Sequence, residues 1–432
     1  MTDASPSFYW LSRPGAKTPH RSWQPLSDAA YWENPNRKPD RHPLLAPPPE
    51  WADDLLRVAR AVFAADRHAL RERSFDRWTR HIRLSIPVTD RELWERAEPH
   101  LVMLLQNMTG DLWEIFFRAL DSGTPTSEPM TAPIYELAQE VTLFSGGLDS
   151  LSWAIQRATV RTSRPLLFVS FDERNFEELQ FDLYSAVERR RERPLRRLTQ
   201  SQTVRGPKGA RAKLERTTRS RGLLYVATAV HAAAAESVAV VHVPENGQLA
   251  LNPPLSAARS GANSTRSVHP ATLYRLNLLI EAVGGCVRVE NPLAHQTKGE
   301  VCAAARESGL SQDVLEATLS CGAPPRRQNI QSELANCGLC YPCLVRRSGL
   351  LHAYGTDRTP YTADPWDPRL PHDRTGHWRA LRRWLDAPCS AIDLVTDTPL
   401  PPDARVDTLF QVIQRGRDEL RSLLRLQRRS IE

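Results

Sequence analysis

The chain has 432 residues, of which 41% are hydrophobic and 25% are charged. This length exceeds what one hydrophobic core needs, so two or three domains are expected, and the composition excludes a wholly disordered chain. No run of about 18 uncharged apolar residues occurs, so no membrane-spanning helix is predicted. Basic residues exceed acidic ones by 7, which permits binding to a polyanion without requiring it. The N-terminus lacks the basic flank and apolar core of a secretory signal, and we expect a cytoplasmic protein.

Residues 1–50 hold ten of the 34 prolines. Because proline lacks a backbone N–H, this stretch is predicted to be an extended arm on a folded surface, with neither a regular helix nor a central strand. Residues 51–133 predict an accessory α+β domain with a strand at 81–86 and helices at 51–65, 92–105 and 112–120. Seven of the eleven tryptophans precede residue 114, so we expect this domain to pack separately and to dock a protein partner.

Residues 138–318 alternate between predicted strands and helices. The strands are expected at 141–144, 165–171, 195–204, 238–243 and 287–289, and the helices from about 151 and at 177–191, 223–235, 273–282 and 298–307. This alternation predicts an α/β domain with a parallel sheet and helices on both of its faces. Residues 356–432 are predicted to be partly helical. Their basic end alternates arginines with leucines, which favours an amphipathic docking helix over an RNA-binding arm.

The first strand of the α/β domain leads into a glycine-rich loop and a helix, an arrangement suited to binding phosphate. The loop consists of Ser145, Gly146, Gly147, Leu148, Asp149 and Ser150. Its glycines allow the backbone to approach an anion, and the helix N-terminus directs partial positive charge at it. Asp149 would repel phosphate and is predicted to hold Mg²⁺ or to orient the loop. The alternative is an ordinary glycine turn; a Walker A loop is excluded because Gly-Lys-Ser/Thr is absent.

Four cysteines near residue 340 have the spacing of a metal site. A double Cys-x-x-Cys motif is preceded by one further cysteine, and the set is Cys321, Cys337, Cys340 and Cys343. Four thiolates complete a tetrahedron around Zn²⁺ and leave no open position, as in structural zinc sites. In a chain without a secretory signal such a set indicates metal binding more than disulfides. An iron–sulfur cluster and a redox pair are the alternatives.

The loop at 145–150 resembles the PP-loop of the N-type ATP pyrophosphatases. Together with Cys-Gly-x-Cys-x-x-Cys-x-x-Arg, which ends at Arg346, it resembles the QueC family of 7-cyano-7-deazaguanine synthases. The segment 297–300 (Thr-Lys-Gly-Glu) is similar to that family's Thr-Lys-x-Glu. The resemblance covers roughly residues 138–350 and implies the Rossmann-like fold of the adenine nucleotide alpha hydrolases. It also implies zinc ligation by the four cysteines of a module spanning 319–355.

The pieces before and after this region are foreign to QueC proper. Segments such as 243–247 and 264–270 are closer to the QueC-like proteins of bacterial anti-phage operons, the Qat system. This resemblance implies that ATP and Mg²⁺ adenylate the carboxylate of 7-carboxy-7-deazaguanine, with release of pyrophosphate. The acyl group then passes to an amine, the N-terminus of a partner protein from the same operon. The alternatives are nitrile synthesis with ammonia, tRNA modification by adenylation of a nucleobase oxygen, and a scaffold without turnover.

Further site residues follow from their positions. Glu245 and Asn246 come directly after a strand, where α/β sheets bind ligands, and a carboxylate there could accept hydrogen bonds from a guanine-like ring. A tight turn with a solvated glutamate is the alternative. Three residues of a polar loop are predicted to line the substrate site, although the histidine beside a proline could be structural: Ser264, Arg266 and His269.

Three cations lie near predicted helix starts, where the helix dipole disfavours positive charge. They are Arg219, Arg221 and Lys298. An anion bound nearby would offset this unfavourable position. We therefore expect Arg221 and Lys298 to act with Asp149 in catalysis, and Arg219 to contact phosphate. A solvated helix start is the alternative for both arginines.

Overall fold

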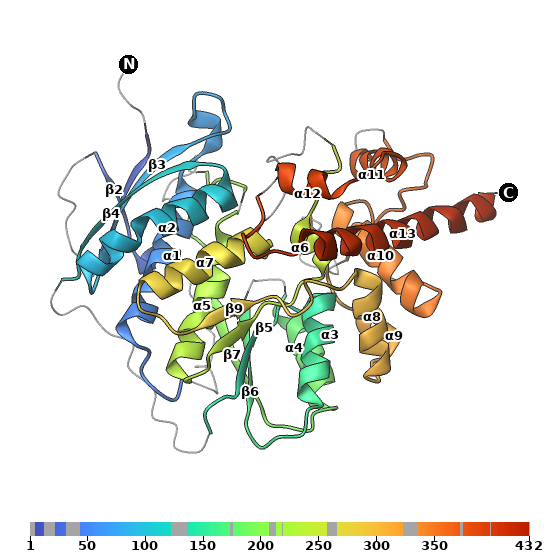
Figure 1. Cartoon of the computed structure of the whole chain (residues 1–432), viewed down its shortest axis with the longest axis horizontal. Coiled ribbons are helices and arrows are strands. Elements are labelled where there is room, and N and C mark those ends of the chain that lie inside the picture. The colour runs from blue at the N-terminus through green and yellow to red at the C-terminus, as the bar shows by residue number, and fades with distance from the viewer. Residues whose placement is uncertain are drawn as a thin grey trace.

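Two parallel β-sheets organise the chain in the computed structural model (Figure 1). The structure describes residues 5–12, 22–31, 44–121, 136–172, 176–206, 213–217, 219–256, 266–322, 335–371, 375–397 and 399–431. Within these ranges, no helix combines the length and the apolar character needed to cross a membrane. The predicted α/β class with parallel sheets flanked by helices is confirmed.

The N-terminal sheet has the strand order β2-β1-β3-β4 and is parallel throughout. Its strands are β1 (Ser7–Trp10), β2 (Gln24–Leu26), β3 (His81–Val88) and β4 (Leu112–Ala119). The prediction of an arm without a central strand is therefore wrong, because β1 lies between β2 and β3. The prolines explain the difference: Pro6 precedes β1 and Pro25 lies in the edge strand β2, so every β1 residue keeps its N–H for the ladder.

The segment 112–119 is a strand and not the predicted helix. Trp113, Ile115 and Phe117 alternate with more exposed residues, and this period of two buries one face of β4 against the sheet. Because this sheet is parallel and covered by helices, the N-terminal unit is an α/β layer rather than the predicted α+β domain. Its elements between the strands are the 3₁₀ turns η1 (Asp28–Ala30) and η2 (Arg71–Arg73) and the helices α1 (Glu50–His68) and α2 (Arg91–Thr109).

The second sheet has the order β7-β6-β5-β8-β9 and is also parallel. Its five strands and the helices that connect them lie close to the predicted positions. The strands are β5 (Glu140–Leu143), β6 (Leu166–Asp172), β7 (Leu195–Ser201), β8 (Val240–His242) and β9 (Arg288–Glu290). The helices are α3 (Leu148–Ala158), α4 (Glu177–Glu188), α5 (Arg221–Ala235), α6 (Gly247–Leu251), α7 (Pro270–Ala282) and α8 (Lys298–Glu307).

One hydrophobic core joins the two sheets. Helices α1 and α2 pack against α5 and α7, and these helices lie between the sheets (Figure 1). Alternate residues of β6 point to opposite faces, so Leu167 and Val169 enter this shared core while Leu166 and Phe168 enter a second core under α3, α4 and α8. The expectation that the N-terminal unit packs separately is therefore wrong.

The C-terminal helices are α9 (Gln312–Glu316), α10 (Tyr341–Tyr354), α11 (Gly376–Asp386), α12 (Ala391–Asp397) and α13 (Val406–Ile431). Of these, α10 packs against α8 and α13 also contacts it (Figure 1). The last of them, α13, packs against α6, α8 and α10 through buried leucine and isoleucine side chains, as predicted for an amphipathic docking helix. Its partner is therefore the rest of this chain.

Candidate functional site

The site lies where the order of the second sheet reverses. The chain runs outward from β5 through β6 to β7 and then returns to place β8 on the other side of β5. In open α/β sheets, ligands bind in the crevice that such a reversal opens beyond the carboxyl ends of the strands. The loop at 144–147 follows β5, and the loop at 243–246 follows β8. The topology therefore brings the predicted phosphate loop beside Glu245 and Asn246.

The predicted phosphate loop is a tight turn held by its own side chains. Gly146 has a φ of 78°, which only glycine adopts without strain. The Ser145 hydroxyl accepts a hydrogen bond from the Gly147 amide at 3.2 Å and lies 3.2 Å from the Ser150 hydroxyl. The Ser150 hydroxyl donates to the Gly147 carbonyl at 2.9 Å. Helix α3 begins at Leu148, so its N-terminus, which carries the positive end of the helix dipole, lies at this turn.

The loop is also fixed from outside. The Gln180 side chain of α4 donates to the Ser145 carbonyl at 3.0 Å, and its Cγ atom would lie 3.2 Å from a Cβ atom at Gly146. On the other side, the Leu148 amide donates to the Ser320 hydroxyl at 3.4 Å. Any side chain at Gly146 would therefore combine backbone strain with crowding against α4.

Asp149 and Lys298 form a buried ion pair at the centre of the site. Lys298 Nζ lies 2.7 Å from Asp149 Oδ2, and the two residues are 1% and 6% exposed. Burial opposes ionisation of the Asp149 carboxyl, but the Lys298 charge and several hydrogen bonds outweigh it, so the pKa of Asp149 is lowered. Lys298 is the first residue of α8, in a capping box formed by Thr297 and Glu300. An anion was predicted near this cation, and the structure places the Asp149 carboxylate there; contact of Lys298 with phosphate stays a prediction.

Asn246 and Glu245 complete the polar cluster. The Asn246 side chain is fully buried, donates to Asp149 Oδ2 at 2.9 Å and accepts from the Leu249 amide at the start of α6. Burial of the Glu245 carboxyl and the negative charge of Asp149 raise the pKa of Glu245 well above its usual range. Asp149 Oδ1 is buried and has no hydrogen-bond partner among the residues that the structure describes. The cluster therefore offers the acceptor atom Asp149 Oδ1 and, beside it, the Glu245 carboxyl, whose raised pKa favours the protonated form.

The remaining predicted substrate residues lie elsewhere or outside the described ranges. Ser264 falls outside the residues that the structure describes. His269 is buried and caps α7, where its Nδ1 atom accepts from the Ala271 amide at 3.2 Å, a contact that fits the structural alternative. Arg266 reaches the Asn107 carbonyl of α2 at 3.5 Å. These contacts connect Arg266 to α2 and His269 to the first turn of α7, and neither contact reaches Asp149.

The arginines at the start of α5 face the N-terminal unit. Arg221 lies over the Tyr225 ring at 5.6 Å and close enough to Arg67 for the two charges to interact. Arg219 donates to the Thr109 carbonyl at 3.0 Å and lies over the Trp78 ring at 4.7 Å. These contacts connect both arginines to the N-terminal unit, and the roles predicted for Arg221 in catalysis and for Arg219 at phosphate stay predictions.

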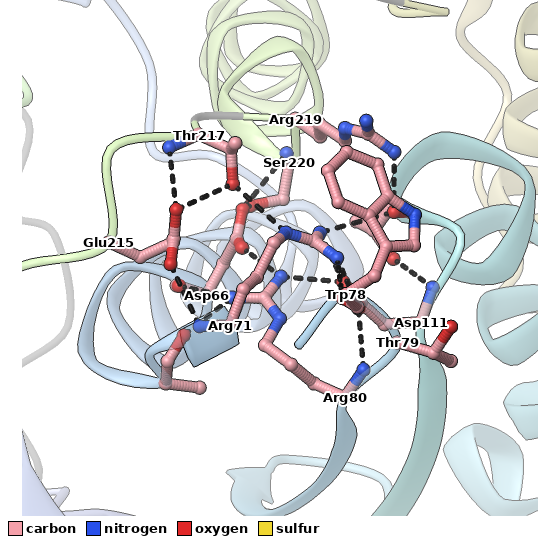
Figure 2. Close-up of polar contacts among 12 residues, drawn as sticks. Asp66, Arg71, Trp78, Thr79, Arg80, Asp111, Glu215, Thr217, Arg219 and Ser220 are labelled. Carbon is pink, nitrogen blue, oxygen red and sulfur yellow. Dashed lines mark hydrogen bonds and ion pairs between the residues drawn. The ribbon is translucent and has the colours of Figure 1, made fainter. Parts of the chain in front are cut away.

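Arg219 belongs to a buried polar network that joins the two units (Figure 2). Asp111 accepts from Arg71 through both oxygens at 2.8 Å and from Arg80 at 2.5 Å. Asp66 of α1 accepts from Arg80 at 2.6 Å and from the Ser220 hydroxyl at 2.5 Å. Ser220 is the residue that precedes α5. An acid of the N-terminal unit therefore contacts the N-terminal end of a helix that flanks the second sheet.

The four predicted cysteines come together. Their sulfur atoms all lie within 4.8 Å of one another, with Cys321 and Cys340 3.9 Å apart and Cys337 and Cys343 3.8 Å apart. Sulfur atoms that surround Zn²⁺ at about 2.3 Å are themselves about 3.8 Å apart. The amides of Leu339 and Cys340 donate to the Cys337 sulfur, which suits a thiolate. The donor set and its dimensions therefore fit a zinc ion.

The cysteine cluster supports the predicted phosphate loop. Asn336, next to Cys337, accepts from the Ser320 amide at 3.0 Å and donates to the Thr318 carbonyl at 3.1 Å. Arg346 of α10 is fully buried and donates to the Thr318 hydroxyl at 2.7 Å. These contacts hold Ser320 at the Leu148 amide, so a metal bound by the cysteines would stabilise one wall of the site.

Two residues of the site were not predicted from the sequence. Gln248 accepts from the Lys298 amide at 2.9 Å. Glu419 of α13 accepts from the Gly299 amide at 3.1 Å and from the Thr297 hydroxyl. Glu419 is 7% exposed, and burial raises its pKa to about 7. The only sequence signal was an acidic residue on the apolar face of an amphipathic helix.

Comparisons with known proteins leave the family open. A scan against protein-family models found none that matches this chain, and a search of curated proteins found no match. The geometry of the loop, the Asp149–Lys298 pair and the cysteine cluster therefore carries the functional proposal.

Proposed function

We propose that this protein is an ATP-dependent ligase that adenylates the carboxylate of 7-carboxy-7-deazaguanine and passes the acyl group to an amine. The carboxylate oxygen attacks the α-phosphorus of ATP, and pyrophosphate leaves. The amine then attacks the carbonyl carbon of the acyl adenylate, AMP leaves, and the amine loses a proton. The observation that carries this proposal is the convergence of the glycine loop, the Asp149–Lys298 pair and Glu245 at the reversal of the sheet.

The loop supplies donors for the triphosphate. Amides at a helix N-terminus and nearby hydroxyls bind phosphate without a Walker lysine, and here the Gly147 and Leu148 amides would exchange the Ser145 and Ser320 hydroxyls for phosphate oxygens. Lys298 supplies the cation in the site, and its position beside Asp149 suits the stabilisation of charge that develops on the departing pyrophosphate. Because Asp149 accepts from both Lys298 and Asn246, it also fixes the distance between the loop after β5 and the loop after β8.

Asp149 also fits a role with Mg²⁺. Mg²⁺ is usually held by one or two carboxylates together with substrate phosphates. Asp149 Oδ1 is the buried acceptor that lacks a partner among the described residues, and it is the atom that would hold the ion. When bound, Mg²⁺ would neutralise the phosphate charge that Asp149 itself repels.

Glu245 fits the purine-like ring of the proposed substrate. The Watson–Crick edge of guanine carries N–H donors, and a carboxylate accepts from such donors. Because the pKa of Glu245 is raised well above its usual range, binding of these donors would favour its ionised form and release a proton. A resident zinc ion would be structural, since four cysteines leave no open coordination position.

The test is incubation of the purified chain with ATP, Mg²⁺ and 7-carboxy-7-deazaguanine. The expected products are AMP and pyrophosphate, dependent on the deazaguanine acid. D149N should abolish their formation, because it removes the charge that pairs with Lys298. Release of ADP and phosphate would refute adenylation.

A second measurement identifies the amine. The chain is co-expressed with the proteins encoded beside it, and the intact mass of each is determined. A partner whose mass increases by the deazaguanine acyl group supports transfer to a protein amine. Formation of free 7-cyano-7-deazaguanine from ammonia, with every partner unmodified, would instead make the chain a nitrile synthase.

A further inference from the structure

Lys298 is held in place by contacts from three different helices. Its backbone amide donates to Gln248 of α6, and its side-chain stem lies against Gly349 of α10, where any Cβ atom would collide with it. Residues on both sides of it, Thr297 and Gly299, donate to Glu419 of α13. A lysine side chain has four rotatable bonds, so these contacts decide whether its ammonium stays beside Asp149.

Helix α13 packs tightly against the first turn of α8 and against α6. A Cβ atom at Gly299 would overlap the Glu419 carboxyl, and one at Gly416 would overlap the Gln248 side chain. The absence of a side chain at Gly299 allows the Glu419 carboxyl to contact the first turn of α8. The absence of a side chain at Gly416 allows α13 to pack against Gln248, which binds the Lys298 amide. Arg415, one turn before Glu419, pairs with Glu300 of α8 at 2.6 Å.

We propose that Glu419 is a positioning residue, which acts through Thr297 and Gly299 to fix the Lys298 ammonium on Asp149. The C-terminal helix is then part of the active centre, and any event that lifts α13 would switch the site off. The effect of Glu419 on catalysis rests on the proposed ligase function. Its effect on the position of the Lys298 ammonium does not. Glu419 acts through Thr297 and Gly299, so it is not called a catalytic residue.

The geometric consequence can be measured without turnover. The sequence contains five lysines, so acetylation by an amine-reactive ester can be followed at each by mass spectrometry. Lys213 is exposed and serves as the internal reference for reagent. We expect E419A to raise the labelling rate of Lys298 at least about fivefold, the effect of losing one hydrogen bond. E419Q retains an acceptor for the Gly299 amide and should stay close to wild type. D418N alters an exposed acid on the same helix and is the matched control.

The catalytic consequence is read from AMP-forming turnover. Loss of positioning should lower kcat of E419A by about 10- to 100-fold, with a smaller change in KM for ATP, and E419Q should rescue most of kcat. If E419A does not fold, E419D, which keeps the charge but is one methylene too short, must show the rise in Lys298 labelling.

The outcomes separate the two proposals. A folded E419A or E419D with Lys298 still protected overturns the positioning role, whatever the activity. A wild-type chain that forms no pyrophosphate, combined with increased Lys298 labelling in E419A, overturns the ligase function and leaves the positioning of Lys298 supported. Equal loss of kcat in E419A and E419Q, with Lys298 protected in both, would contradict positioning as well.

Discussion

Lys298 Nζ lies 2.7 Å from Asp149 Oδ2, and both side chains are almost completely buried. Removing one partner of such a pair leaves an uncompensated charge in a poorly solvated site. We expect K298M and D149N each to lower the free energy of unfolding by about 3–5 kcal/mol. The double variant should lose less than the sum, because its second substitution removes the stranded charge. Urea unfolding of the four proteins measures this coupling.

An exposed pair of similar length is the control for this cycle. Arg91 and Glu95 are 2.8 Å apart on the surface of α2, so R91M should change the unfolding free energy by less than about 1 kcal/mol. Strict additivity of K298M and D149N would mean that the two charges do not stabilise each other.

The four-cysteine cluster predicts a structural metal. The purified chain should contain about one zinc ion, and C337S should lose it, because three thiolates leave the tetrahedron incomplete. The cluster holds Ser320 against the phosphate loop, so C337S should lower stability by more than about 4 kcal/mol and weaken ATP binding. Elemental analysis and thermal unfolding check this. C389S, at a cysteine outside the cluster, should retain the metal. A metal-free chain of full stability would contradict the assignment.

The network in Figure 2 predicts that the N-terminal unit is essential for folding. D111N leaves Arg71 and Arg80 without their shared carboxylate, and D66N weakens the contact with Ser220 before α5. Each should cost about 3–5 kcal/mol in urea unfolding. E192Q, in an exposed pair with Arg161, should be nearly neutral. A chain lacking residues 1–130 that still unfolds cooperatively would refute this integral role.

The alternating elements of residues 138–318 could be predicted because buried strands and amphipathic helices follow simple periods. The segment 112–119 was assigned wrongly because aromatic residues fit either period in a short run. His269 and Arg266 were expected to line the site as part of a polar loop, yet His269 caps α7 and Arg266 contacts the Asn107 carbonyl of α2. The contact of Glu419 with Gly299 joins residues 120 positions apart. Nothing local in the sequence specifies such a pair, because it depends on how α13 packs across α6, α8 and α10.

Gly146 tests whether the glycine loop binds the nucleotide. Its φ of 78° makes G146A strained by about 1–2 kcal/mol, and the new methyl group would crowd Gln180. We expect weaker ATP binding together with this loss of stability. Gly309 has a φ of 80° and open space around it, so G309A should carry similar strain without affecting ATP. Calorimetric titration with ATP compares the two. Equal ATP affinity in both variants would argue against nucleotide binding at this turn.

Glu419 predicts a pH dependence of stability with a definite sign. Burial raises the pKa of Glu419 from about 4.5 to about 7; the nearby charge of Glu300 also raises it, and that of Arg415 lowers it. Between these two pH values the folded chain therefore holds a proton that the unfolded chain lacks. Raising the pH through this window therefore lowers the contribution of Glu419 to stability, by about 3 kcal/mol in total. The glutamine of E419Q has no ionisable group. All other ionisable groups, including His352 beside Gly299, are the same in E419Q and wild type, so the comparison isolates Glu419.

The quantity to measure is the difference in unfolding free energy between E419Q and wild type at several pH values from 4.5 to 8. E419Q should gain on wild type as the pH rises and level off above about 7, because the wild-type carboxyl then ionises in both states. D418N, next to Glu419 but exposed, should show no such trend. A difference that stays constant with pH would mean that the Glu419 carboxyl is already ionised at pH 4.5. The contact between α13 and α8 would then be an ordinary charged cap, with no proton held in the folded state.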